Sequence, residues 1–472
     1  MQLEQPPSFC SFYCIIILNS TLLAAICPAS SSKVFLQLLY NIITKCCYWL
    51  TMNRANITEK TYETAGRDLN CKLLAFIYVR RHASLIAIQN GRIVTPDGII
   101  DNKAVHIQGD RIIAFADGTQ GAERVVNAHG RYIMPGIIDI HSDRIEQYIQ
   151  PRATSQMDIE YALKVCERDL LGAGITTMYH SISLYKKGVF GGSSDLRTQG
   201  NMQIIADLIA DIHMRFHLIH HRFHLRIEID NIDAFDIAWS MISQGKVHLI
   251  SFMDHTPGQG QYRDLSQYRG ALADISDSDF EALMKEHQNK PKLSFQQQKD
   301  LAAFARSKGI AVASHDDDNA AKLEANKDIG VAISEFPIDM ATANKAKELG
   351  FYTVVGAPNI LRGRSHSGNM SASEAILAGG ADILCSDYYP AAVLQSIFYM
   401  HEKYNAPLHQ IVNMATLNPA KATCIDNDYG SLEIGKKADL LIVEILDGYP
   451  IITHVFVDGN TTSRIEYRKQ AL

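Results

Sequence analysis

The chain has 472 residues, a formal net charge of −6, 47% hydrophobic residues and 20% charged residues. This length is enough for one large domain and a smaller one with a sizeable buried core, and the composition excludes a disordered chain. Because the total charge is acidic, nothing indicates a basic face for nucleic acid or for an anionic membrane. We predict neither partner for the main body.

The first 85 residues differ in texture from the remainder. The stretch from Phe9 to Cys27 is mostly apolar, yet no basic residue precedes Lys33, as a secretory signal would require. An upstream extension, a signal or membrane anchor, and a folded accessory segment are therefore all open for residues 1–85. Six of the nine cysteines lie before residue 72, so the main body has no disulfide framework, which predicts a cytoplasmic location.

Short β segments occur at both ends of the main body. Leu85–Val94 forms two strands around an Asn-Gly turn, and Val105–Ile113 repeats this pattern. Gly430–Ile434, Ala438–Val443 and Ile452–Val457 are further short strands near the other end. We predict one small β domain assembled from residues 86–133 and 426–472.

Between residues 134 and 425, short apolar strands alternate with helical stretches. The eight predicted strands are Met134–His141, Ile175–His180, His224–Ile229, Val247–Met253, Ile310–His315, Val331–Phe336, Tyr352–Gly356 and Asp382–Asp387. Strand–helix alternation implies a parallel sheet, and eight such units predict an α/β fold of the (β/α)₈ barrel type. A doubly wound open sheet is the alternative, although no Gly-x-Gly-x-x-Gly motif follows an early strand.

Metal-capable side chains fall at the ends of most of these strands, which is where barrel active sites lie. They are His141 and Asp143, His180, Glu228, Asp254 and His255, His315 with the run Asp316–Asp318, Glu335, and Asp387. Imidazole and carboxylate ligands together suit divalent ions. We therefore predict a bound divalent metal ion, with Zn, Mn, Fe and Mg as the candidates.

Two positions have a role that follows from their spacing. Residues two apart in a strand point the same way, so His141 and Asp143 can both face the barrel axis and share one ion. At the last strand, Asp387 is placed to take a proton from water, because a metal ion lowers the pKa of bound water to about neutrality. We assign Asp387 as catalytic base and metal ligand. Part of the run Asp316–Asp318 can instead cap the helix beginning at Asn319, so not all three are assigned as ligands.

Three stretches resemble motifs of the amidohydrolase superfamily. Met134–His141 is similar to its first-strand motif, Gly430–Leu440 to its closing β-domain motif, and Thr416–Ala420 to the helix between barrel and tail. The resemblance implies a metal-dependent hydrolase on a (β/α)₈ barrel with a small β domain.

Glu228, His255 and His315 are the remaining metal-ligand candidates. Some members of the superfamily use a carboxylate on strand three, which makes Glu228 a candidate bridging ligand. An ion pair with Arg226 or Arg222 is the alternative for Glu228, and a hydrogen bond to substrate is the alternative for His255.

Within the superfamily, several stretches resemble the diphosphatases of the carbon–phosphorus lyase pathway, which act on α-D-ribose 1-methylphosphonate 5-triphosphate. They are His141–Asp143, Met253–Tyr262, Ala313–Asp317, Gly356–Asn359 with Arg362–Asn369, and Ser386–Pro390. Most of the superfamily has His-x-His on strand one, whereas this group has Asp at the second position, as here. Arg144 departs from the small polar residue expected next in that group.

A triphosphate requires positive charge and backbone donors around it. The candidate substrate-binding residues are Arg152, Gly258, Gln259, Arg362, Arg364, His366 and Asn369. Gly258 and Gly260 would let backbone N–H groups approach an anion closely, whereas the arginines can instead simply lie on the surface. The histidines from His213 to His224 are interpreted as part of an amphipathic connection before strand three, not as a metal-binding tract.

The resemblance implies hydrolysis of this phosphorylated sugar phosphonate to the 5-phosphate and pyrophosphate. The nearest alternative is another amidohydrolase, acting on a cyclic amide or amine. A non-catalytic scaffold of a phosphonate-processing complex is an alternative of another class. Both a monomer and a homo-oligomer are compatible with the sequence.

Overall fold

The computed structural model describes residues 84–468, apart from 153, 185–196, 198, 213–214, 261–268, 270–275 and 364–369. The chain divides into two compact units, Met1–His82 and Ala83–Leu472, and the described residues belong to the second. The alternatives stated for residues 1–85 therefore concern a segment that lies almost wholly outside the described residues.

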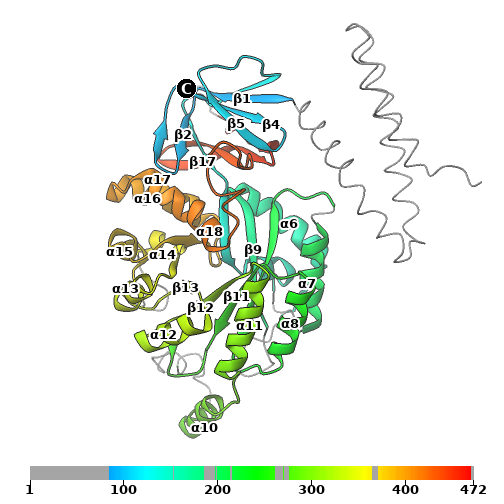
Figure 1. Ribbon diagram of the computed structural model, residues 1–472, viewed down its shortest axis with the longest axis vertical. Coiled ribbons are helices and arrows are strands. Elements are labelled where there is room, and N and C mark those ends of the chain that lie inside the picture. Colours follow the sequence, from blue (N-terminus) through cyan, green and yellow to red (C-terminus); the bar gives the residue numbers. More distant parts are fainter. Residues whose placement is uncertain are drawn as a thin grey trace, which may run out of the picture. The chain divides into compact units, whose positions relative to one another are not determined.

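Strands from both ends of the main body form two small sheets. The first contains β1 (Leu85–Gln89), β4 (Ala104–Gln108), β5 (Arg111–Ala116) and β6 (Arg124–Asn127) in the order β5-β4-β1-β6. The second contains β2 (Arg92–Thr95), β3 (Gly98–Ile100), β7 (Tyr132–Pro135), β16 (Leu440–Leu446), β17 (Tyr449–Val457) and β18 (Asn460–Arg464) in the order β18-β17-β16-β7-β2-β3. Because β16 pairs with β7, segments about 300 residues apart in sequence share one sheet, as the coloured ends in Figure 1 show.

Eight parallel strands form the barrel, in strict sequence order. They are β8 (Ile137–Ser142), β9 (Ile175–Leu184), β10 (His220–Glu228), β11 (Leu249–Met253), β12 (Ala311–His315), β13 (Ile333–Glu335), β14 (Tyr352–Gly356) and β15 (Ile383–Cys385). An isolated parallel bridge between Ser142 and Asp387 joins the last strand to the first. The predicted (β/α)₈ barrel is confirmed, because a doubly wound open sheet would reverse its strand order and leave two free edges.

Helices follow the strands and surround the barrel. They are α5 (Arg144–Ile149), α6 (Ile159–Gly172), α7 (Gln199–Ile212), α8 (Ala234–Ser243), α10 (Asp277–Gln288), α11 (Phe295–Ser307), α12 (Ala320–Ile329), α13 (Met340–Glu348), α14 (Ala357–Arg362), α15 (Ala372–Leu377), α16 (Ala392–Tyr404), α17 (Leu408–Ala415) and α18 (Leu417–Ala422). Local sequence fixes where several begin: at α11, the Ser294 hydroxyl accepts from the Gln297 N–H while the Gln297 side chain accepts from the Ser294 N–H. Among the described residues, no helix is long and apolar enough to cross a membrane.

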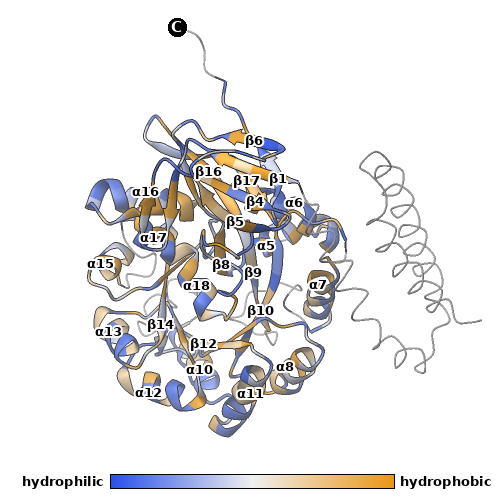
Figure 2. Ribbon diagram, turned by 45° about the horizontal axis from the view of Figure 1, so that its top comes forward, coloured by the Kyte–Doolittle hydropathy of each residue, from blue (hydrophilic) through white to orange (hydrophobic). Residues whose placement is uncertain are grey.

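The barrel interior is packed with apolar side chains, so it is a core and not a pore. Ile138, Tyr179, Leu249 and Ile333 are buried there, and Figure 2 shows hydrophobic residues concentrated on strands such as β16 and β17 of the neighbouring domain. Gly136 immediately precedes the first barrel strand, and glycine is required there because a Cβ would lie 2.1 Å from the Thr176 Oγ1.

The β domain contacts the starts of barrel strands. The Gly136 N–H donates to the Asp439 carbonyl at 2.9 Å, and the His220 imidazole lies 2.9 Å from the Asp439 carboxylate. His220 is the first residue of β10. The carboxyl ends of the strands, where the predicted site lies, are therefore at the opposite end of the barrel from these contacts.

Two expectations about histidines are wrong. His220 and His221 were expected in a connecting segment before a strand that starts at His224, but β10 begins four residues earlier and includes both. His180 was expected to end the second strand, but β9 continues to Leu184. Inside the wall, His180 Nε2 lies 2.9 Å from His221 Nδ1, so this pair is structural and does not reach the mouth. His213 lies outside the described residues.

Candidate metal centre

His141, His315 and Glu335 converge at the carboxyl ends of β8, β12 and β13. Their ligand-capable atoms all lie within 4.8 Å of one another. The His141 Nδ1 is 2.9 Å from the Glu335 Oε1, and the His141 and His315 ring centroids are 5.3 Å apart. All three side chains are buried. Two imidazoles and a carboxylate in this arrangement are a ligand set for a divalent ion.

A second group shares His315 and extends toward β11. It adds His255 and Asp316, whose ligand-capable atoms are also within 4.8 Å of one another and of His315. Glu228 is not a member of either group; its Oε1 lies 2.5 Å from the His255 Nδ1. A carboxylate behind an imidazole fixes the orientation and tautomer of that ring. Glu228 thus contacts His255, and the alternative ion pair with Arg226 or Arg222 is not formed within the described residues.

Several atoms of these groups are buried without a hydrogen-bond partner. Neither carboxylate oxygen of Glu335 forms a well-aligned hydrogen bond, and neither do the Nδ1 atoms of His141 and His315 or the Oδ2 of Asp316. The closest contacts are between these atoms themselves: His141 Nδ1 lies 2.9 Å from Glu335 Oε1, and His315 Nδ1 lies 3.0 Å from Asp316 Oδ2. Burial lowers the pKa of His141 well below its usual value, so this neutral ring does not balance the Glu335 charge. A buried carboxylate is strongly unfavourable unless a cation compensates its charge. The described residues therefore fit a divalent cation. Glu335, a strand-end carboxylate outside the predicted ligand set, is a further ligand candidate. Its signal was the same as that of His315, a polar residue closing an apolar strand.

Left-handed residues follow three of the strands that form the mouth. Asp316, Phe336 and Asp387 have φ values of 51°, 56° and 57°. For residues other than glycine this conformation costs about 1–2 kcal/mol, so it persists where the surroundings impose it. It turns the chain sharply where each strand ends.

Asp387 closes the barrel beside the first strand. Its N–H donates to the His141 carbonyl at 3.0 Å, and its own carbonyl accepts from the Asp143 N–H at 3.1 Å. Burial, with the nearby Asp143 charge, raises the pKa of Asp387 to about 7. Asp143 lies one residue beyond β8 at the start of α5, and burial raises its pKa too. The strand periodicity that paired Asp143 with His141 therefore ends at Ser142, and Asp143 is in neither group of three.

Behind this pair, Asp139 is buried and accepts from the Ser386 N–H at 3.1 Å, and burial raises its pKa to about 6. Below the groups, His224 Nδ1 lies 3.0 Å from the Ile140 carbonyl and its Nε2 lies 2.9 Å from the Ser251 hydroxyl. Burial lowers the pKa of His224 to about 3, so this ring is neutral at pH 7. The floor of the site thus carries no positive charge from His224.

We expect the metal-free Asp387→Asn variant to gain stability over the metal-free wild type as pH rises from 5 to 8. The Asp387 pKa is about 7 in the folded protein and near 3.8 when unfolded. Folded protein holds this proton more tightly, so the contribution to stability is full below pH 3.8 and lost as pH rises through 7. The gain is at most about 3 kcal/mol. Urea unfolding of both proteins in chelator at pH 5 and pH 8 measures it; an equal difference at both pH values contradicts it.

The acidic run after β12 divides into one ligand candidate and two structural residues. Asp317 is buried and accepts from the Ser314 and Ser334 hydroxyls, both at 2.5 Å, and from the Asn326 amide at 2.8 Å. Asp318 accepts from the Gly260 N–H at 2.8 Å. That bond occupies the Gly260 donor in this structure, and the approach of this N–H to a substrate anion stays a prediction.

Replacing Asp317 with Ala should destabilise the protein without removing metal. Three buried donors lose their acceptor, and each unsatisfied donor costs about 1–3 kcal/mol, so a loss of about 3 kcal/mol or more is expected. Urea unfolding and metal analysis of the same sample measure the two quantities. Asp300→Ala, on the exposed face of α11, is the control. Unchanged stability with reduced metal content would instead make Asp317 a ligand.

The candidate substrate-binding residues are partly described. Arg152 and Arg362 are exposed, as are Gly258 and Gln259 in the loop after β11. Arg364, His366 and Asn369 lie outside the described residues. Arg144, the departure noted in the strand-one motif, lies 3.4 Å from the Asp169 carboxylate on α6. Its guanidinium therefore contacts the helix layer. The role of these residues in binding stays a prediction.

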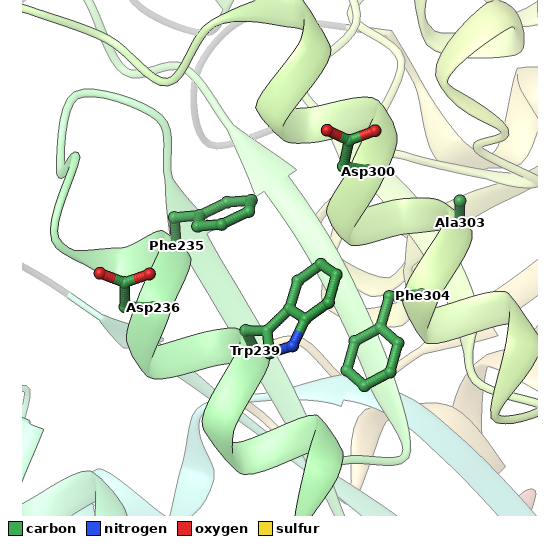
Figure 3. A pocket seen from close by; sticks show the side chains of 6 residues that line it. All are labelled: Phe235, Asp236, Trp239, Asp300, Ala303 and Phe304. Carbon is green, nitrogen blue, oxygen red and sulfur yellow. The ribbon is translucent and has the colours of Figure 1, made fainter.

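A shallow apolar groove lies on the outer helix layer, away from the strand ends. Phe235, Asp236 and Trp239 of α8 face Asp300, Ala303 and Phe304 of α11, as Figure 3 shows. The rings of Trp239 and Phe304 stack with centroids 4.2 Å apart. This groove contains no histidine and is not a candidate for the metal chemistry described above.

The fold and the buried groups define a (β/α)₈ barrel whose mouth can hold a divalent cation. A model of the "Amidohydrolase family" matches residues 299–462. The α-D-ribose 1-methylphosphonate 5-triphosphate diphosphatase of Escherichia coli (strain K12) is 30% identical over 383 residues, covering 79% of this chain and 98% of that protein. The chain belongs to the amidohydrolase family, as its motifs predicted.

Solved structures agree at the level of the fold. The ochratoxinase of A. niger has a TM-score of 0.57 at 16% identity, covering 80% of this chain and 95% of that chain. The N-acetylglucosamine-6-phosphate deacetylase of Pasteurella multocida has a TM-score of 0.54 at 12% identity, covering 80% and 99%. At these identities the likeness shows a shared architecture.

Proposed function

We propose that this chain is a metal-dependent diphosphatase that hydrolyses α-D-ribose 1-methylphosphonate 5-triphosphate to the 5-phosphate and pyrophosphate. The main support is the buried group of His141, His315 and Glu335 at the barrel mouth. Its ligand-capable atoms lie close together and lack well-aligned hydrogen bonds, so they fit a divalent cation. The choice of substrate is supported by the 30% identity to the Escherichia coli diphosphatase over nearly its whole length.

The proposed activity requires residues that bind the cation and a residue that accepts a proton. His141, His315 and Glu335 would hold the cation, with His255 and Asp316 as the neighbouring group. When bound, such an ion makes water acidic enough to lose a proton near neutral pH and neutralises phosphoryl charge. The water oxygen attacks the first phosphorus of the 5-triphosphate, which is the one bonded to the ribose oxygen. The bond from that phosphorus to the oxygen of the leaving pyrophosphate breaks.

Asp387 takes the proton of the attacking water on its carboxylate. Its backbone bonds to β8 on both sides fix its position beside His141. Burial among other carboxylates raises the pKa of Asp387 to about 7, which matches proton acceptance at neutral pH. Glu228 orients His255 through its 2.5 Å contact.

The test is pyrophosphate release from the triphosphate by purified full-length protein, with metal analysis of the same sample. Metal-dependent release, and no turnover of a cyclic amide such as a dihydropyrimidine, supports the proposal. Amide turnover without pyrophosphate release would favour the alternative amidohydrolase. Protein that binds no metal would favour the non-catalytic scaffold.

A further inference from the structure

On the inward face of β10, the positively charged side chain of Arg226 lies between a histidine and a glutamate. His224, Arg226 and Glu228 alternate along this strand, so they point to the same side. His224 lies at the floor beside Ser251, and Glu228 contacts His255 near the mouth. Arg226 lies between them, half-buried, at the level of His315.

The Arg226 guanidinium has few partners for a half-buried charge. Its Nη2 donates to the His315 Nε2 at 3.1 Å, and its Nε contacts the Met253 sulfur at 3.1 Å. In the described part of the chain, it forms no ion pair within 4.0 Å with a carboxylate. Its positive charge acts from farther away and partly offsets the rise in the pKa of Asp143 and Asp387 that burial causes. Guanidinium groups removed from water are normally matched by carboxylate or phosphate oxygens.

Within the described residues, Arg226 donates to one nitrogen acceptor, the His315 Nε2, and that acceptor is lost when His315 binds metal. A neutral imidazole has one lone pair and one N–H. A metal ion on Nε2 consumes the lone pair that accepts from Arg226. A metal ion on Nδ1 places the proton on Nε2, which then cannot accept either. Metal binding through either nitrogen therefore frees the guanidinium donors.

We propose that Arg226 is a substrate-binding residue that holds an anionic phosphoryl oxygen once the metal site is filled. This inference rests on the proposed function for the class of ligand, a phosphate ester or anhydride. The forked N–H groups match two oxygens of one phosphoryl group. Binding of metal and binding of anion are then coupled through His315, because the first releases the donor that the second requires.

The experiment is calorimetric titration of pyrophosphate into the metal-loaded full-length protein. Arg226→Met should weaken pyrophosphate binding about 10- to 100-fold, the usual range for a lost charge-assisted bond. Arg226→Lys should fall between the two, because it keeps the charge and loses the fork. Metal content should be unchanged in both. In chelator-treated protein, the two substitutions should change pyrophosphate binding less than about threefold.

Arg215→Met is the matched control, because this exposed arginine pairs with Glu160 on the helix layer. It should bind pyrophosphate as the wild type does. Equal binding by wild type and Arg226→Met, with equal metal content, would overturn the inference. Loss of metal from both Arg226 variants would also overturn it, since Arg226 would then only position His315. If wild type fails to hydrolyse the triphosphate but its pyrophosphate binding still depends on Arg226, the proposed substrate is wrong and this inference stands.

Discussion

Asp387→Asn should lower kcat for pyrophosphate release by about 10²- to 10⁴-fold, the range that a positioned general base supplies. The amide keeps the size of the side chain but cannot accept the proton of the attacking water. The backbone bonds of Asp387 to His141 and Asp143 do not involve the side chain and should persist. Steady-state kinetics at saturating metal measures the effect, and KM should change much less than kcat.

Asp382→Asn is the matched control at the other end of β15. Asp382 immediately precedes β15, at the end away from the mouth, where it pairs with Lys347 and accepts from the Thr353 N–H at 3.0 Å. Its replacement should reduce stability while activity per folded molecule stays close to wild type. Similar kcat losses in both variants would mean that any substitution next to β15 lowers activity. The assignment of Asp387 as the base would then fail.

The architecture was predictable because it depends on patterns that are local in sequence. Each barrel strand is a short apolar run between turn signals, and all eight were placed within a few residues of their observed bounds. The errors arose where a strand continues through polar residues. β9 continues past His180, and β10 begins at His220, because these side chains satisfy one another between the wall and the helices. Periodicity of apolar residues cannot show such pairs.

The candidate site was only partly predictable. His141, His255 and His315 could be selected as strand-end histidines, and the structure places all three in groups that can hold metal. Glu335 and Arg226 were not assigned, because a glutamate or arginine in a strand is more often a surface residue than a buried one. Their importance follows from charges that are withdrawn from water without an opposite charge beside them, which is a property of the folded chain alone.

Hydrogen-bond partners also distinguish neighbouring residues of the same type. Asp316, Asp317 and Asp318 are consecutive carboxylates, yet only Asp316 joins the group with His255 and His315. Asp317 is satisfied by three donors and Asp318 by the Gly260 N–H and the Asn319 amide. A buried carboxylate with its donors in place stabilises the fold, whereas one without them lowers stability until a cation arrives.

Glu335→Gln should therefore lower metal affinity by at least tenfold and, without metal, leave the protein as stable as wild type or more stable. Glu335 is fully buried, and its closest contact is the His141 Nδ1 at 2.9 Å. Burial lowers the pKa of His141 well below its usual value, so this neutral ring does not balance the charge, which needs a cation. The glutamine keeps the shape and removes the charge. Metal titration and chelator-treated urea unfolding measure the two effects.

Glu167→Gln provides the contrast, because Glu167 is also buried but its carboxylate accepts from the Leu218 N–H at 2.9 Å and contacts the His221 Nε2 at 3.2 Å. Removing that charge should lower stability and leave metal affinity unchanged, the reverse of the Glu335 result. Two buried glutamates in one barrel should thus respond oppositely to the same substitution. Wild-type metal affinity in Glu335→Gln, or parallel behaviour of the two variants, would show that the group of His141, His315 and Glu335 is a structural cluster without a metal.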